Sequence, residues 1–204
     1  MPKERIVSKL KQARGINTRE KIVEAAQNYF CETGYYEASI RKLADAANIS
    51  VGSFYFYFKD KDELLVEVYQ RQTDEFLKAV GDCLGRAEQY QSDRKMWLRE
   101  FTLNLLETYG NSGRLRSELK ALNYENPEIA RQRKQIKDQA VTLMLESIQK
   151  SPMIDDFKVK HLRIALLFII DMVDSAYDRI WDQPDCKEEV IEECQDAIYK
   201  YLFC

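Results

Sequence analysis

The part of the chain with the clearest chemical character is the run VGSFYFYFKDK, residues 51–61. The run begins with small side chains, continues with alternating phenylalanine and tyrosine, and ends in lysine. If it is helical, Phe54 and Phe58 face inward together. Tyr55 and Tyr57 then point away from them and can donate hydroxyls to phosphates. Small side chains let a helix N-terminus approach another molecule closely, and its free N–H groups favour phosphate. The run therefore suits contact with a polyanion.

Two short helices joined by a short turn are predicted around this run. Ser39 can cap a helix over IRKLADAA, residues 40–47, and Asn48 can end it. After the turn, Ser50 can cap the helix VGSFYFYF. Two helices connected in this way form a helix-turn-helix, whose second helix fits the major groove of DNA. The expected partner is double-stranded DNA.

A first helix is predicted upstream of this pair. Asn17 and Glu20 have the spacing of a capping box, apolar residues follow at helical spacing through Phe30, and Gly34 can end the helix. Residues 1–16 precede the cap and are rich in lysine and arginine. They form either a flexible basic arm that contacts phosphate or the minor groove, or a solvated tail.

At these residues the sequence resembles the tetracycline-repressor (TetR) family of regulators. The resemblance covers roughly Thr18 to Leu65, and its most specific part is VGSFYFYFKDKDELL, an aromatic core followed by K-x-K-x-x-L. Many members have histidine where this chain has Tyr57, which keeps a hydrogen-bonding ring but removes a titratable imidazole. Carried over position by position, the resemblance implies DNA contacts at Ser39, Arg41, Ser50, Gly52, Ser53, Tyr55, Tyr57 and Lys61. Val51 joins them as one of the small residues at the start of the third helix.

The whole chain is predicted to be all-α, because glycine (7) and proline (4) are scarce and no run alternates with period two. Helix breaks are expected near 81–85, 89–93, 110–113, 126–127, 151–152 and 183–184. We expect a three-helix head on a larger helical part. The predicted division is a basic arm (1–16), a helix-turn-helix DNA-binding domain (17–62) and a ligand-binding and dimerisation domain (63–204).

The C-terminal part contains a long apolar helix. Residues 162–180 are apolar in nearly every direction around the helix axis, which predicts burial on all sides. The family resemblance implies that the last two helices, about 157–181 and 187–201, pack against their copies as a four-helix bundle. It also implies a homodimer on a palindromic operator and release by a small-molecule inducer, with repression as the default.

Aromatic residues of this part could line a ligand cavity, although each is individually more typical of plain core. Asp171, Asp174 and Asp178 are spaced three and four apart and share one helix face, where like charges need compensation. One hypothesis is a cationic inducer stacked on an aromatic ring; the alternatives are solvent, or pairing with basic residues of another helix or subunit. The candidate ligand-binding residues are Trp97, Phe101, Phe168, Asp171, Asp174, Tyr177, Asp178 and Trp181.

Charge is distributed unevenly along the chain. Residues 1–61 carry eleven basic and seven acidic side chains, a net charge of +4, so with −3 overall the remainder carries −7. A basic N-terminal part on an acidic body indicates that only one end meets a polyanion. Random scatter of surface charge is the alternative.

Other classes of protein are disfavoured by missing motifs. The sequence has no P-loop, no G-x-S-x-G, no G-x-G-x-x-G and no clustered metal ligands, so we expect no catalysis, no metal and no cofactor. The five cysteines are scattered and suggest reduced, mostly buried thiols. No apolar run approaches the length of a membrane span and no secretory signal is present, so the expected location is the cytoplasm. A helical adaptor that binds only proteins is the remaining rival, and salt-sensitive DNA binding would separate the two.

Overall fold

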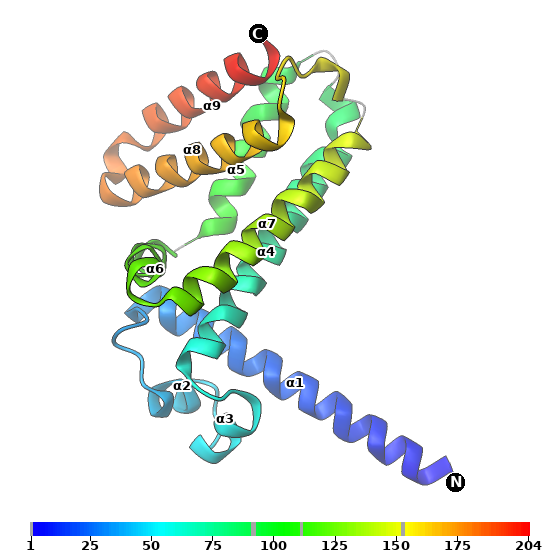
Figure 1. Cartoon of the computed structure of the whole chain (residues 1–204), viewed down its shortest axis with the longest axis vertical. Coiled ribbons are helices and arrows are strands. Elements are labelled where there is room, and N and C mark those ends of the chain that lie inside the picture. The colour runs from blue at the N-terminus through cyan, green and yellow to red at the C-terminus, as the bar shows by residue number, and fades with distance from the viewer. Residues whose placement is uncertain (1, 91–92, 111, 152–153) are drawn as a thin grey trace. The chain divides into compact units, whose positions relative to one another are not determined.

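The computed structural model describes residues 2–90, 93–110, 112–151 and 154–204, with side chains from residue 17 onward except at 87, 88 and 109. No β-strand occurs among these residues, which confirms the all-α prediction. The α-helices are α1 (Pro2–Thr33), α2 (Ile40–Ala46), α3 (Val51–Tyr57), α4 (Lys61–Gly85), α5 (Arg94–Tyr109), α6 (Gly113–Glu125), α7 (Pro127–Gln149), α8 (Leu162–Asp182) and α9 (Lys187–Phe203) (Figure 1). Short 3-10 helices cover Ala87–Tyr90, Ile154–Asp156 and Pro184–Cys186.

Most predicted helix ends are confirmed. Helix α1 ends before Gly34, whose φ of +98° is the left-handed conformation expected of a glycine after a helix. Helix α7 begins at Pro127, where a missing N–H costs nothing. Helix α8, however, begins at Leu162, about five residues later than expected, so its N-terminal boundary was predicted wrongly.

The predicted start of the first helix is also wrong. Helix α1 begins at Pro2, and Asn17 lies inside it rather than at an N-cap. Residues 3–14 consist mostly of good helix formers and contain neither glycine nor proline, and the single Gly15 before the capping-box sequence does not interrupt the helix. The contacts predicted for the side chains of the basic arm, residues 1–16, lie outside the described part of the chain.

The chain divides into two compact units. The head unit comprises Met1–Gln70 and Arg114–Gln132, and the body unit comprises Arg71–Gly113 and Arg133–Cys204. The core of the head unit includes Phe30, Phe54 and Phe58, and also Leu115 and Leu119 of α6. Helix α6 therefore shares the core of the head, although we expected the whole of 63–204 to form the other domain.

The body unit is built from the second half of α4 with α5, α8, α9 and most of α7. Helices α8 and α9 are consecutive, antiparallel neighbours (Figure 1). Leu166, Ile169 and Val173 of α8 are buried in its core, whereas Ile164 and Phe168 are exposed. The prediction that α8 is buried on all sides is therefore wrong for a single chain, because only one face of this helix packs on the core of the body unit. In the described part of the chain, no helix is long and apolar enough to cross a membrane.

Candidate nucleic-acid interface

Helices α2 and α3 have the caps that the sequence predicts. The Ser39 hydroxyl accepts the backbone N–H of Lys42 at 3.3 Å, and the Ser50 hydroxyl accepts that of Ser53 at 3.0 Å. Between the two helices, Asn48 has a φ of +53°, a left-handed conformation that asparagine tolerates better than most residues. The backbone therefore turns sharply over Ala47–Ser50, and a helix-turn-helix results.

Two residues of the aromatic run, Phe54 and Phe58, hold α3 against the core of the head unit, as predicted. Phe54 and Phe58 are fully buried and their rings pack together, with centroids 5.9 Å apart. The Arg19 guanidinium lies over the Phe58 ring at 4.9 Å from its centroid, and it also forms an ion pair with Glu67. These contacts connect α1, α3 and α4, so they set the direction in which the other side of α3 points.

The opposite side of α3 faces solvent. Tyr55 is 54% exposed and Val51 is exposed as well, whereas Tyr57 is half-buried and packs partly on the core. The most exposed side chain of the helix is Phe56, at 80%. We did not select Phe56 from the sequence, although its position is about 200° around the helix from Phe54 and so opposite the buried face.

Gly52 lies on the same outward side, four residues before Phe56. A Cβ added at Gly52 would contact only the Ser50 Oγ, at 3.8 Å, and its φ is not in the left-handed region. The fold of the head unit therefore does not require glycine at this position.

Lys61 has a different environment from the one expected. Its Nζ donates to the carbonyl oxygens of Tyr35 and Ala38, both at 2.9 Å, and lies 4.0 Å from the centroid of the Tyr35 ring. Desolvation lowers the pKa of the Lys61 ammonium. Two of its three donors thus stabilise the connection between α1 and α2, and its predicted phosphate contact remains a prediction.

Other cations of the head unit are more accessible. The side chain of Lys59 is 87% exposed and lies 3.7 Å from Asp60. Arg41 is exposed near the start of α2, beside the exposed Ser39. Ser39, Arg41 and Lys59 are therefore accessible on the head unit, and the DNA contacts expected of Ser39 and Arg41 remain predictions. Lys59 was not among the residues predicted to contact DNA.

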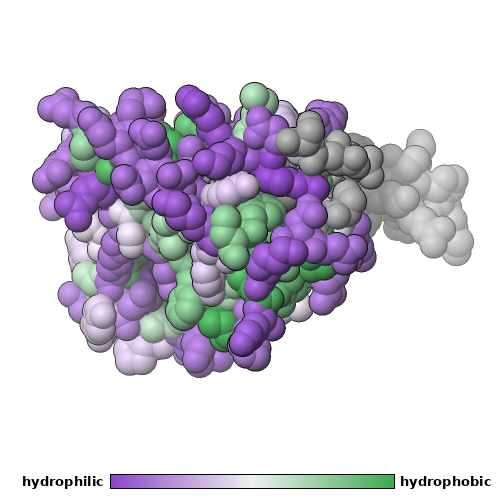
Figure 2. Space-filling model, turned by 90° about the horizontal axis from the view of Figure 1, so that it is seen from above, coloured by the Kyte–Doolittle hydropathy of each residue, from purple (hydrophilic) through white to green (hydrophobic). Residues whose placement is uncertain are grey.

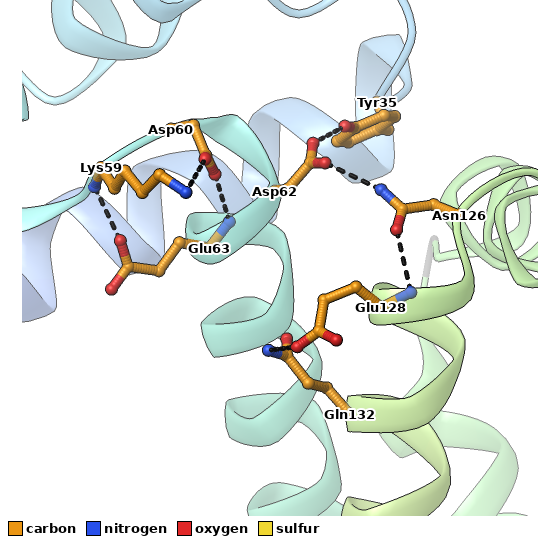
Figure 3. Close-up of polar contacts among 8 residues, drawn as sticks. All are labelled: Tyr35, Lys59, Asp60, Asp62, Glu63, Asn126, Glu128 and Gln132. Carbon is orange, nitrogen blue, oxygen red and sulfur yellow. Dashed lines mark hydrogen bonds and ion pairs between the residues drawn. The ribbon is translucent and has the colours of Figure 1, made fainter.

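The start of α4 is held by a network of polar contacts within the head unit (Figure 3). The Asp60 carboxylate accepts the N–H of Glu63 at 2.9 Å, and the Glu63 carboxylate accepts the N–H of Lys59 at 2.6 Å. Asp62 lies between two further groups, accepting from the Tyr35 hydroxyl and, at 2.9 Å, from the Asn126 amide. Burial and the hydrogen bond to Asp62 raise the pKa of the Tyr35 hydroxyl.

Helix α6 supports the turn after Gly34. The Glu118 carboxylate accepts the backbone N–H groups of Tyr35 and Tyr36, the second at 3.3 Å. A Cβ at Gly34 would displace this carboxylate, and the φ of +98° is a conformation that favours glycine. No local pattern in the sequence indicates this contact, because the partners are 83 residues apart.

The candidate ligand-binding residues of the body unit do not form one site. Trp97 and Phe101 stack with centroids 5.1 Å apart and line a cavity of about 40 Å³ whose lining is wholly apolar. The other aromatic candidates lie elsewhere: Phe168 is exposed, the Tyr177 hydroxyl donates to the Gly110 carbonyl at 2.7 Å, and the Trp181 ring lies against Gly113.

The three aspartates do not line that cavity either. Asp171 is exposed and pairs with Lys137 of α7 at 2.9 Å. Asp174 and Asp178 are half-buried and have partners of their own. For Asp171 the structure therefore favours the alternative of pairing with a basic residue of another helix.

Comparison with known proteins agrees with the helix-turn-helix. A family model described as bacterial regulatory proteins, tetR family, matches residues 22–68. A protein of Haemophilus influenzae named an uncharacterized HTH-type transcriptional regulator is 28% identical over 185 residues, which cover 89% of this chain and 95% of that protein. The probable acrEF/envCD operon repressor of Escherichia coli is 30% identical over 66 residues, only 32% of this chain and 30% of that protein.

The fold has relatives of known structure over nearly its whole length. A putative TetR-family transcriptional regulator from Mesorhizobium loti superimposes with a TM-score of 0.74 at 15% identity, covering 94% of this chain and 99% of that one. Members of this family regulate transcription and are not enzymes, in agreement with the prediction made from the missing catalytic motifs. The family model thus places a TetR-type helix-turn-helix at residues 22–68, and the full-length relative and the shared fold extend the likeness to TetR-family regulators over nearly the whole chain.

Proposed function

We propose that this protein binds a palindromic DNA operator as a homodimer, represses transcription there, and is released by a small apolar ligand. The observation that carries the proposal is the outward side of α3. It combines a glycine without a structural need with an exposed tyrosine, on a helix that Phe54 and Phe58 fix from behind. A surface of this kind suits the major groove, because the helix backbone can lie close to base edges while hydroxyls reach phosphates.

The homodimer is supported by apolar side chains that the last two helices leave exposed. Ile164 and Phe168 lie on the outer face of α8, and Tyr201 is exposed on α9. Figure 2 shows apolar surface interrupting the polar surface on one face of the protein. Covering such side chains with a second copy stabilises the dimer at roughly 25 cal/mol for each Å² of apolar area. Two heads related by a twofold axis then contact two equivalent half-sites.

The ligand class follows from the lining of the cavity in the body unit. Its walls come from apolar side chains such as Trp97, Phe101 and Ile169, and no charged group lies among them. A charged ligand would lose its hydration there without a partner, whereas an apolar one would gain. The cavity holds about 40 Å³, room for only about one to three water molecules. A ligand must therefore displace core side chains as it enters, and its binding changes the packing of this unit.

Repression is the direction of regulation that we propose, because the Escherichia coli relative is named an operon repressor. A dimer that covers an operator within a promoter would block access to that DNA. A promoter–reporter fusion measures the direction: expression should rise when the gene is deleted. A fall would identify an activator.

DNA binding is tested by selecting duplexes with the purified full chain and measuring affinity by fluorescence anisotropy. Affinity should fall steeply with rising salt, since binding releases counterions from DNA. Tyr55→Phe should weaken binding to all sequences by a few fold, because it removes one hydroxyl. Tyr124→Phe is the matched control, an exposed tyrosine of α6, and should bind like the parent. A chain that selects no duplex and binds only proteins would contradict the proposal.

The ligand is tested by a thermal-shift screen that compares neutral aromatic compounds with charged ones, namely fatty acids, cationic dyes and polyamines. Apolar compounds should raise the melting temperature of the parent and of Asp171→Asn equally. Stabilisation by cations alone, lost in Asp171→Asn and Asp174→Asn, would instead support a ligand held by the acidic face of α8.

A further inference from the structure

Phe56 occupies the outermost position of α3. It is 80% exposed, whereas Phe54 and Phe58 on either side of it are fully buried. Successive residues of a helix turn by about 100°, so the Phe56 ring lies on the side opposite the core. Its ring contacts that of Tyr57 edge-on, with centroids 5.0 Å apart. The head unit therefore gains little packing from the Phe56 side chain.

A single exposed apolar residue is common and by itself indicates nothing. A second observation comes from Gly52, four residues earlier on the same side, where the fold leaves room for a side chain that is absent. Glycine in a helix lowers stability relative to alanine. The outward side of α3 thus combines a position without a side chain and a large apolar ring, neither of which stabilises the head unit.

We propose that Phe56 packs on the 5-methyl group of a thymine and so specifies an A·T pair in each half-site. This inference rests on the DNA binding proposed above. A phenyl ring has no hydrogen-bond donor or acceptor, so it cannot distinguish guanine, cytosine or adenine by their polar edges. The thymine methyl is the apolar group that base edges present in the major groove. The missing side chain at Gly52 lets the helix come close enough for the ring to reach that methyl.

The test uses the selected duplex and replaces its thymines one at a time by deoxyuridine, which lacks only the methyl group. At one position in each half-site the parent should lose about fourfold in affinity, the equivalent of one buried methyl group. In Phe56→Ala the same replacement should have no effect, and selection should no longer enrich thymine there. Phe56→Leu, which keeps an apolar side chain, should retain part of the preference. Tyr124→Phe, outside the predicted interface, is the control and should keep the full fourfold response at that position.

The outcomes separate this inference from the proposed function. If the parent binds its operator but deoxyuridine affects the parent and Phe56→Ala equally, the contact to thymine is refuted and DNA binding stands. Phe56→Ala should not change the oligomeric state of the DNA-free protein in light scattering or lower its melting temperature by several degrees. Either change would mean that the ring makes a protein contact and that the inference is wrong. If the parent selects no duplex at all, the proposed function fails, and this inference fails with it.

Discussion

Replacing Gly52 by alanine should have opposite effects on folding and on DNA binding. The added Cβ would meet only the Ser50 Oγ, at an ordinary contact distance of 3.8 Å, and the backbone is not left-handed there. Alanine should therefore raise the free energy of unfolding by about 0.5–1 kcal/mol, the usual advantage over glycine in a helix. For a chain of this size the melting temperature should rise by about 1–4 °C.

The same methyl group should weaken DNA binding. It would lie on the outward side of α3, where we propose that the helix backbone approaches the bases. Forcing an extra methyl group into a close contact typically costs about 1–3 kcal/mol, which corresponds to a loss of roughly 5- to 160-fold in affinity. Thermal denaturation followed by circular dichroism measures the first effect, and fluorescence anisotropy with the selected operator measures the second.

Two other glycines provide controls. Gly81 lies in α4 with no atom within 4 Å of a Cβ added there, so Gly81→Ala should raise the melting temperature and leave DNA affinity unchanged. Gly34 has a φ of +98°, and a Cβ there would lie 2.6 Å from the Arg114 Nε and closer still to Glu118. Gly34→Ala should therefore lower the melting temperature. If Gly52→Ala bound DNA like the parent, close approach of α3 at this position would be refuted.

Four further predictions concern assembly, charge and thiols. Phe168→Asp should leave the chain folded but monomeric in light scattering, because it places a charge on the exposed face of α8. Lys59→Ala should reduce the slope of log affinity against log salt by about 1 if the lysine binds one phosphate, without changing the melting temperature. Lys61→Ala should lower both affinity and melting temperature, since its Nζ supports two backbone carbonyls. In alkylation at pH 8, exposed Cys204 should react first, and Cys194 last, because burial raises the pKa of the Cys194 thiol to about 11 and leaves about one thiolate in a thousand.

Each of these predictions has a result that contradicts it. Leu166→Asp is the control for assembly, since Leu166 is buried in the core of the body unit and a charge there should unfold the chain. A dimeric Phe168→Asp would place the interface elsewhere. An unchanged salt slope for Lys59→Ala would mean that this lysine does not bind phosphate. Equal melting temperatures for Lys61→Ala and the parent would mean that the two carbonyls do not depend on the ammonium. Labelling of Cys194 as fast as Cys204 would show that the body unit opens readily.

Local features of the helix-turn-helix followed from the sequence alone. A serine cap bonds to an N–H three residues on, and a buried ring at 54 predicts another at 58, because both relations depend only on helix geometry. Helix geometry also indicates Phe56, which lies opposite the buried face of α3. The start of α1 does not follow from its capping-box sequence, because that sequence cannot begin a helix that already runs through the residues before it.

Contacts between long side chains and distant segments depended instead on the tertiary structure. Lys61 bonds to carbonyls more than twenty residues away, Asp171 pairs with Lys137 from another helix, and Glu118 supports the turn after Gly34. A flexible or charged side chain can reach several partners from one helix position, and the free energies of those alternatives differ little. Which partner it meets depends on how the cores pack, and that is not encoded in any local spacing.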